Sequence, residues 1–428
     1  MIKFQIKPKT QNTIPARCCT FASGSKFKFV YLGFEYLKIG IFLDFIFLVF
    51  GISGLFRLGM ILLVCFSCSG NSTPGRDKLI HGLPLSEISP KYATGFKVFD
   101  GSHYQVLEIF VPWDSINAVQ RFYLLGDNPD NVTIPKDGVT LSIPLENMAC
   151  FSATHLSFAH ALGLIGRIVG VSSTDFVVSE EFQHLVGSGK IKEVGIGGHF
   201  NLEKLIQLNP QIIMISPQKG QTFDPLINAG LNIVMNGDYL EHSPLGRAEW
   251  IKMMGLLFGK EGEAMQIFDS ISSKYETLKN LTKNIGTRPV VLSGKQYSGF
   301  WSLPGGKSYV SQFISDAGGT YLFADNPETG GLTLDFEAVY AKGLKADFWR
   351  FLIYSQDEFT SGAFLTEDPR YADFFAFKNK KVFVCNTFKT PYFQKGLLEP
   401  QIILSDYIKI LHPKILPQHQ NVYYHLLP

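Results

Sequence analysis

The chain has 428 residues, of which 46% are hydrophobic, 18% charged and 14% aromatic. This length suits two ordinary domains, and the composition is too apolar for a disordered protein. The 39 basic and 37 acidic side chains leave a net charge of +2. Nucleic-acid binding is therefore set aside, because it needs clustered basic charge to neutralise phosphates.

Residues 1–67 are predicted to form a leader. Residues 1–59 hold eight basic and two acidic side chains, which leaves 31 basic and 35 acidic for the rest of the chain. A charge inside a membrane span is costly, so Arg57 is expected to close a positively charged segment and residues 58–66 to form the short apolar core of an export signal. Such a signal needs nothing before residue 55, and a start codon assigned too early would explain the residues that precede it.

Cys68 follows the apolar core and is preceded by the small residue Ser67. It resembles the lipid-carrying cysteine of bacterial lipoproteins, although Cys65 stands where leucine is usual. We therefore expect Cys68 to carry lipid and residues 68–77 to form a polar tether, which would hold the protein on the periplasmic side of a bacterial membrane. The alternative is an uncleaved anchor through residues 45–66, which are numerous enough to span a bilayer.

Two cysteines remain after Cys68, at Cys150 and Cys385, and both lie in apolar, strand-like runs. We expect two buried free thiols, with one disulfide as the alternative.

The elements along the chain change character at residue 147. Residues 78–146 contain short β-rich runs separated by turn residues, and they predict an extension of antiparallel strands near 96–99, 105–110 and 121–125. Residues 147–243 alternate apolar strands with helices and predict a first α/β lobe, with strands near 149–151, 168–171, 211–215 and 232–235 and helices near 156–162 and 202–208. Strands that are apolar on both faces indicate a parallel sheet covered by helices.

Residues 244–285 are predicted to bridge two lobes. Apolar side chains recur at helical spacing over residues 246–283, and one helix of that length would reach about 50 Å, with Gly255, Gly259 and Gly262 able to bend it. Residues 286–428 repeat the α/β alternation, with strands near 290–292, 348–354 and 381–384 and a helix over 309–317. The predicted fold is therefore α/β, with two Rossmann-like lobes of mainly parallel sheet joined by a long helix, preceded by the β-rich extension.

An ordered set of motifs runs through residues 147–412, each weak alone and specific as a set. They are Arg167–Val171, Asn201–Leu205, Leu208–Ile213, Ala229–Val234, Ser243–Ile251, Pro304–Gly306, Asp316–Gly319 and Leu334–Val339. In this order the chain resembles the substrate-binding proteins of ABC importers for iron–siderophore, haem and cobalamin ligands, including the vitamin B12-binding proteins.

This resemblance implies a monomeric capture protein that converts nothing. It would hold an iron- or cobalt-bearing chelate or tetrapyrrole between its lobes and deliver it to an ABC permease and its ATPase. It implies no cofactor of the protein's own. It also implies that Glu203 and Glu337, each at a helix start, contact arginines of the permease. The alternative for both is an acidic residue that a helix N-terminus merely favours.

The loops that follow the strands are the expected ligand site, because ligands of open α/β sheets bind at the carboxyl ends of strands. Aromatic residues dominate these loops, as expected for a large, flat or apolar ligand, and the cluster of Tyr297, Phe300 and Trp301 is central to the prediction. Lys295 is expected to select polar groups of the ligand. The expected ligand-binding residues are Thr154, His155, Thr174, Phe176, His199, Tyr239, Lys295, Tyr297, Phe300, Trp301, Tyr309 and Tyr392.

Two other functions stay open. Zinc or manganese binding of the same architecture would use His155 and His199, although no third and fourth ligand stand out. An exported α/β enzyme is less favoured, because the phosphate-loop and dinucleotide templates fail. Trp301 occupies the position of the first glycine that a phosphate loop ending at Ser308 would need, and Phe200 that of the last glycine in a dinucleotide fingerprint from Gly195.

Overall fold

The computed structural model describes residues 78–80, 83–101, 103–110, 119–126, 133–175, 179–196 and 199–428, all within the unit Pro74–Pro428. The predicted leader (1–67), the tether (68–77), Cys68 and Phe176 lie outside the described residues. Within the described residues, no helix combines the length and the apolar character needed to cross a bilayer.

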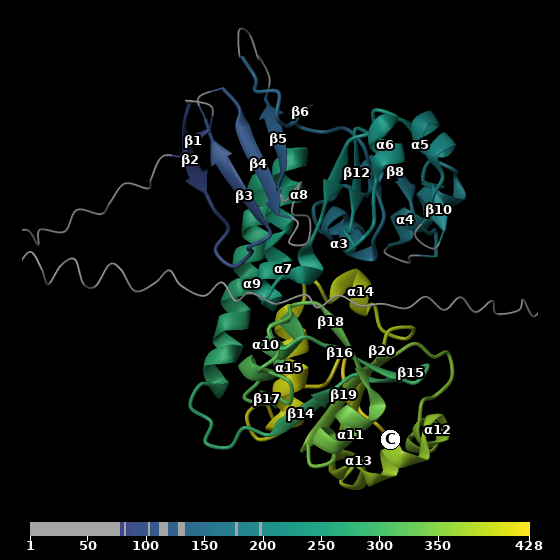
Figure 1. Cartoon of the computed structure of the whole chain (residues 1–428). Helices are drawn as coiled ribbons and strands as arrows, with labels where there is room; N and C mark the ends of the chain where they lie inside the picture. The colour runs from purple at the N-terminus through teal and green to yellow at the C-terminus, as the bar shows by residue number, and fades with distance from the viewer. Residues whose placement is uncertain are drawn as a thin grey trace, which may run out of the picture. The chain divides into compact units, whose positions relative to one another are not determined.

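The extension is a six-stranded sheet with the strand order β1-β2-β3-β4-β5-β6 (Figure 1). Neighbouring strands are antiparallel, as predicted, except that β5 and β6 run parallel. Its strands are β1 (Lys78–Ile80), β2 (Leu83–Ile88), β3 (Phe96–Asp100), β4 (Gln105–Phe110), β5 (Val119–Leu125) and β6 (Val139–Ser142).

The first lobe is a five-stranded parallel sheet in the order β13-β12-β7-β8-β9. Ile213 and Ile215 pack with Leu205 on one face of the sheet, whereas Ile212 and Met214 belong to the core on the other face. This burial on both faces confirms the predicted parallel sheet. The elements are β7 (Met148–Cys150), α3 (Ala153–Ala161), η1 (Ile165–Arg167), β8 (Ile168–Val171), α4 (Glu180–Gly187), β9 (Lys192–Glu193), β10 (Gly195–Ile196), β11 (His199–Phe200), α5 (Leu202–Leu208), β12 (Ile212–Ile215), α6 (Asp224–Asn228), β13 (Ile233–Met235) and η2 (Asp238–Leu240).

The second lobe has a sheet in the order β17-β14-β19-β20-β21, parallel except for the last pair, and a separate antiparallel sheet β15-β16-β18. Cys385 on β20 and Cys150 on β7 are both buried and free, which confirms the thiol prediction. The elements are β14 (Val290–Ser293), β15 (Lys295–Tyr297), β16 (Phe300–Pro304), α10 (Tyr309–Asp316), β17 (Thr320–Tyr321), β18 (Gly331–Asp335), α11 (Phe336–Gly343), β19 (Phe348–Ile353), α12 (Ser361–Glu367), η3 (Pro369–Asp373), α13 (Phe375–Lys378), β20 (Val382–Asn386), α14 (Tyr392–Lys395), α15 (Pro400–Leu411) and β21 (His425–Leu426).

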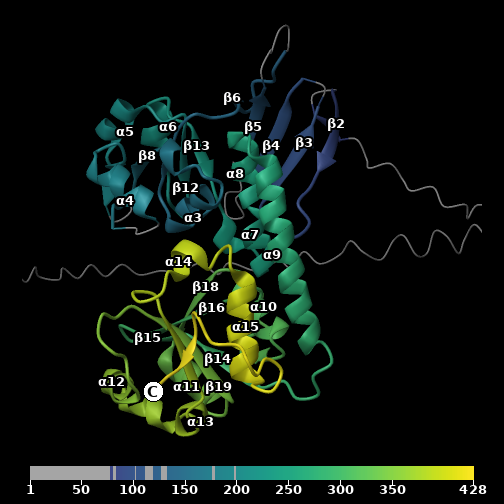
Figure 2. The same cartoon turned by 180° about the vertical axis from the view of Figure 1, so that it is seen from behind.

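The bridge is three helices, and the prediction of one helix over residues 246–283 was wrong. They are α7 (Pro244–Glu249), α8 (Ile251–Phe258) and α9 (Glu261–Thr282). Gly259 ends α8 at φ 65°, a conformation that glycine adopts without steric cost. After this turn α9 packs back on α8 so closely that a Cβ on Gly255 would lie 2.6 Å from the Cβ of Ala264. With 22 residues, α9 is about 33 Å long and reaches the second lobe beside α15 (Figure 2).

Two buried carboxylates attach the extension to the end of the first lobe and to the bridge. Glu249 accepts the backbone N–H groups of Lys91, Tyr92 and Ala93 at 3.0, 2.6 and 2.9 Å. Glu241 accepts those of Thr94 and Gly95 and also the Trp250 indole N–H, at 2.9 to 3.0 Å. Five consecutive backbone donors therefore end on two side chains, Glu241 at the end of the first lobe and Glu249 on the bridge.

The extension also covers an edge of the first lobe. The Gln120 side chain of β5 donates to the Ile233 carbonyl at 3.2 Å and accepts the Met235 N–H at 3.0 Å. The side-chain amide of Gln120 thus forms hydrogen bonds with backbone groups of the edge strand β13, as a neighbouring strand would.

Candidate functional site

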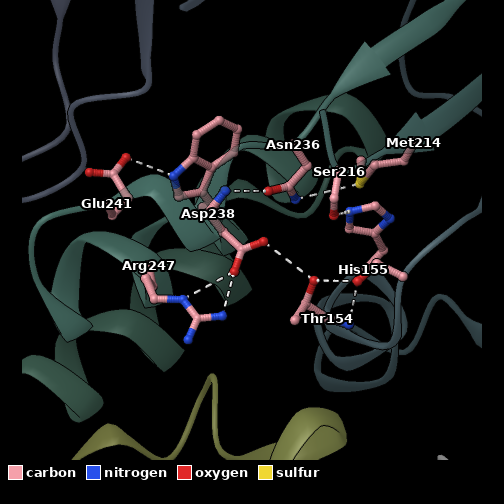
Figure 3. Close-up of polar contacts among 10 residues, drawn as sticks. Thr154, His155, Met214, Ser216, Asn236, Asp238, Glu241 and Arg247 are labelled. Atoms are coloured by element: carbon pink, nitrogen blue, oxygen red, sulfur yellow. Dashed lines mark hydrogen bonds and ion pairs between the residues drawn. The ribbon is translucent and has the colours of Figure 1, made fainter. Parts of the chain in front are cut away.

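A polar network lies where strands of the first lobe end (Figure 3). The Asn236 side chain, just after β13, accepts the N–H of Asp238 at 3.1 Å and fixes the turn. Asp238, only 1% exposed, accepts the Thr154 hydroxyl at 3.3 Å and the Arg247 guanidinium at 2.8 and 3.2 Å. The network joins the start of α3, which follows β7, and the turn after β13 to helix α7 of the bridge.

Arg247 connects this network to the second lobe. Its guanidinium carbon lies 4.1 Å from the centroid of the Tyr309 ring, at the start of α10. An arginine that pairs with a carboxylate on one side and stacks on a ring on the other is held in one orientation. The ion pair of Arg247 and Asp238 therefore aligns the two lobes at this point.

A pocket of about 400 Å³ opens beside this contact. Its size falls within the range of small-molecule sites, roughly 300 to 1,000 Å³. Tyr239 contributes from the first lobe, where its hydroxyl donates to the Pro217 carbonyl and burial raises its pKa to about 12. The other lining residues, from the second lobe, are Gly294, Lys295, Tyr297, Ser302, Leu303, Pro304, Ser308, Tyr309, Val310, Thr329, Gly330, Gly331, Arg350, Phe351 and Leu352.

A smaller cavity marks where the lobes touch directly. Thr154 of α3 and Arg247 face Tyr392 and Phe393 of α14 across it. Its volume is about 20 Å³, room for roughly one water molecule. The lobes are closed here, so the larger pocket is the candidate ligand site.

The structure brings half of the twelve predicted ligand residues to these two cavities. Tyr239, Lys295, Tyr297 and Tyr309 line the larger one, and Thr154 and Tyr392 line the smaller. Lys295 is already paired with Glu367, at 2.6 Å.

Three other predicted residues lie near the surface but line neither cavity. Thr174 donates both its N–H and its hydroxyl to Glu193, at 3.0 and 3.1 Å, which lowers the pKa of that carboxyl group. His199 is exposed on β11, and Phe300 is 54% exposed on β16.

Trp301 corrects the central prediction, because it lies in the core of the second lobe and not at its surface. It is 0% exposed, its ring centroid is 5.4 Å from that of Trp349, and its indole N–H donates to the Ser293 carbonyl at 3.2 Å. On β16 the side chains alternate, so Trp301 and Leu303 point inward while Phe300 and Ser302 point outward. Trp301 cannot stack on a ligand from this position.

His155 is the second correction. It is 0% exposed inside α3, and its Nε2 lies 3.3 Å from the Ser216 hydroxyl (Figure 3). Burial lowers its pKa from 6.5 to about 3. A neutral, enclosed imidazole is a core residue and reaches neither a ligand nor a metal.

The buried His155 predicts a specific loss of stability in acid. Below pH 6.5 the unfolded chain binds a proton at this ring, whereas the folded protein does so only near pH 3. Stability should therefore fall as pH drops through this window, by about 2 kcal/mol at pH 5 from this group alone. Chemical denaturation at pH 7 and pH 5 should show a smaller difference for His155→Leu than for wild type.

His160, exposed on the same helix, supplies the matched control. His160→Leu should keep the wild-type difference between pH 7 and pH 5. An acid dependence that is equal in His155→Leu and wild type would contradict the assignment.

The structure adds residues that the sequence did not single out, Asp238 and Arg350 above all. Asp238 carried no signal, since one acidic residue in a turn is common. Arg350 did carry a signal in the sequence, because it interrupts the apolar run of β19, a strand expected to be buried on both faces. In the described part of the chain, no three His, Cys, Asp or Glu side chains are grouped so that they could hold a metal ion.

Two lobes of parallel sheet, joined by a helical bridge and enclosing a pocket at the ends of their strands, define a two-lobed ligand-binding protein. The chain belongs to the periplasmic binding protein family, whose sequence profile matches residues 148–387. The family resemblance and the predicted fold class are confirmed.

Among curated relatives, an uncharacterised lipoprotein of Methanocaldococcus jannaschii is 31% identical over 318 residues, covering 70% of this chain and 74% of that protein. A second uncharacterised lipoprotein of that organism is 24% identical and covers 75% of this chain and 85% of its own.

Solved structures share the fold. An ABC transporter substrate-binding protein of Listeria monocytogenes aligns with a TM-score of 0.50 at 17% identity, covering 63% of this chain and 99% of its own. A protein of an ABC-type Fe³⁺-hydroxamate transport system from Saccharomonospora viridis also aligns with a TM-score of 0.50, at 16% identity, covering 63% of this chain and 94% of its own.

Proposed function

We propose that this protein is the substrate-binding component of an ABC importer. It captures an iron–siderophore, haem or cobalamin-type ligand between its lobes and delivers it to a membrane permease. The observation that carries the proposal is the pocket of about 400 Å³ between Tyr239 of the first lobe and Tyr297 and Tyr309 of the second, in a chain of this family. Aromatic faces bury large apolar ligands and stack on flat ones.

Exposed aromatic side chains at the strand ends of the second lobe support the same class of ligand. Tyr354 follows β19 and is 78% exposed, and its ring lies 5.3 Å from that of Phe388, which follows β20. Tyr297, at the turn between β15 and β16, is equally exposed. Large rings left in water at a binding edge favour a partner that covers them.

Native mass spectrometry of protein purified from its own cells, followed by titration with haem, cobalamin and ferric siderophores, tests the function. We expect one ligand per chain. Tyr297→Ala should weaken binding by about tenfold without loss of folding, because its exposed ring contributes to the pocket and not to the core. Tight one-to-one zinc or manganese binding, with no affinity for the chelates, would favour the metal-importing alternative.

We propose further that Cys68 is lipid-modified and holds the protein at the outer face of the membrane. The two relatives described as lipoproteins support this anchor. The intact mass of the mature protein measures it directly: an unmodified Cys68 would remove the proposal.

Docking to the permease is proposed for Glu203 and Glu337. Both are exposed in the first turn of a helix, Glu203 on α5 and Glu337 on α11. Asn201 caps α5 by accepting the N–H of Lys204 at 3.0 Å. Arg370 lies 2.9 Å from the carboxylate of Glu337, whereas Glu203 forms no ion pair with any residue that the structure describes.

Reversing both charges should impair transport and spare binding. Exposed ion pairs are worth only about 0.2 to 1 kcal/mol each, so Glu203→Lys with Glu337→Lys should lower uptake about threefold or more. Ligand affinity of the purified double variant should stay at the wild-type value. The control is Glu181→Lys with Glu358→Lys, which makes the same change of charge at two other exposed positions. Equal uptake by the two double variants would contradict the docking role.

A further inference from the structure

Arg350 is a buried cation in the middle of β19 (Phe348–Ile353), a strand with paired neighbours on both sides. Arg350 is only 5% exposed. One terminal nitrogen donates to the Ser293 hydroxyl at 3.1 Å, and the other donates to the Tyr424 hydroxyl. The Nε–H has no hydrogen-bond partner in the described structure.

No carboxylate among the described residues lies within ion-pair distance of Arg350. Three tyrosines surround it instead, Tyr392, Tyr407 and Tyr424, whose rings pack against one another with centroids 5.0 Å (Tyr407 and Tyr424) and 6.0 Å (Tyr392 and Tyr424) apart. Neutral hydroxyl groups solvate a guanidinium but do not neutralise it. An arginine stays charged in a protein, and a buried charge without a counter-charge is strongly unfavourable.

The other cations around the cavities differ from Arg350 in this respect. Arg247 lies 2.8 Å from Asp238, and Lys295 lies 2.6 Å from Glu367. Their charges are balanced within the protein. Of the cations that line these two cavities in the described part of the chain, Arg350 is the one without a carboxylate partner.

Arg350 also lines the pocket of about 400 Å³, next to Phe351 and Leu352. The described residues that line this pocket include two cations, Lys295 and Arg350, and no aspartate or glutamate. Since Glu367 already neutralises Lys295, the pocket has one uncompensated positive charge. Arg350 is shielded from bulk water, and an ion pair formed at such a position is stronger than one at the surface.

We propose that the natural ligand carries an anionic oxygen group, a carboxylate, that pairs with Arg350 in the floor of this pocket. This inference rests on the proposed function, because it names the chemistry of the captured molecule. Arg350 supplies the counter-charge, and the aromatic side chains of the pocket cover the rest of the ligand. Neutral ligands of the same size and shape are discriminated against, because they leave the guanidinium buried and unpaired.

Matched probe pairs test the preference on the wild-type protein. Haemin carries two propionate groups, and its dimethyl ester removes both charges from the same ring. Ferric citrate offers carboxylates, and ferrioxamine B is a ferric hydroxamate complex without them. The carboxylate-bearing member of at least one pair should bind tenfold or more tightly than its partner. Equal affinity within both pairs would overturn the proposal.

Substitution of Arg350 tests whether this residue causes the preference for carboxylate-bearing ligands. Arg350→Gln should lower affinity for the carboxylate-bearing probe by roughly 30-fold or more and change affinity for its carboxylate-free partner little. Arg350→Lys, which keeps the charge, should retain the preference. Lys295→Gln, the second cation of the pocket, should cause a smaller loss because Glu367 already balances it. An unchanged preference in Arg350→Gln would overturn the proposal.

Thermal unfolding with iron-free citrate separates this inference from the proposed function. Compared with sodium chloride at equal ionic strength, citrate should raise the melting temperature of wild type and raise that of Arg350→Gln less. If neither haem, cobalamin nor ferric chelates bind but citrate acts through Arg350, the importer function fails and the anion site stands. If those ligands bind without regard to carboxylates or Arg350, the function stands and the anion site is refuted.

Discussion

Replacing Trp301 by alanine is expected to lower the free energy of unfolding by about 3 to 5 kcal/mol, the usual cost of emptying a large aromatic site in a core. The ring is wholly buried, with centroid distances of 5.4 Å to Trp349, 5.8 Å to Phe336 and 5.9 Å to Phe374. The indole N–H bond to Ser293 is lost as well. Urea denaturation monitored by circular dichroism measures the change.

Two further variants, Trp301→Phe and Tyr297→Ala, distinguish a role in the core from a role in ligand binding. Trp301→Phe keeps most of the buried volume, so its cost should be clearly smaller than that of alanine. Tyr297→Ala, only four residues away but 78% exposed, should change stability little and ligand affinity more. Folded Trp301→Ala should retain wild-type affinity. A stable Trp301→Ala protein that no longer binds ligand would contradict the assignment of Trp301 to the core.

This contrast shows what an aromatic cluster in a sequence can and cannot predict. Tyr297, Phe300 and Trp301 are neighbours in the chain, and their abundance near a strand end predicted a ligand site at this edge of the second lobe. Strand periodicity places residues 300 and 301 on opposite faces, so the two rings cannot share one surface. Which face is buried depends on β18 and on residues near 371, far away in the sequence.

The lobes themselves followed from local patterns. Runs such as 212–215 and 168–171 are apolar at successive positions, which only a sheet covered on both faces can accommodate. Helix α5 has the predicted bounds, Leu202–Leu208, because an Asn cap before it and Asn209, at φ 44°, after it limit it from both ends.

The bridge was harder to predict because apolar side chains recur at helical spacing through all of its segments. Helical spacing continues through Gly259, and periodicity alone does not reveal a chain reversal. The signal for the chain reversal was local. Gly259 ends α8 with a positive φ, and after Lys260 the acidic residue Glu261 begins α9. Arg350 is a similar case, since its meaning depends on the absence of a nearby carboxylate, which only the fold can show.

Glu249 is expected to be as important for stability as Trp301, through a different mechanism. Its carboxylate is 0% exposed, accepts three consecutive backbone N–H groups of residues 91–93, and lies 2.8 Å from Lys252. Removing it leaves three donors and a partly buried ammonium group without their acceptor. Buried charged groups that lose a partner in this way typically cost about 3 to 5 kcal/mol.

Glu249→Ala should therefore detach the extension from the bridge before the rest of the protein unfolds. Hydrogen exchange at residues 91–95 should rise far more than exchange within β12 or β19, and proteolysis should cut after Lys91. Glu263→Ala is the control, because this exposed residue of α9 has only a surface ion pair with Lys260 and should change stability by less than about 1 kcal/mol. Unchanged exchange at residues 91–95 in Glu249→Ala would show that the bonds to Glu241 and the packing of Phe96 on Trp250, with ring centroids 5.0 Å apart, are enough to hold the extension in place.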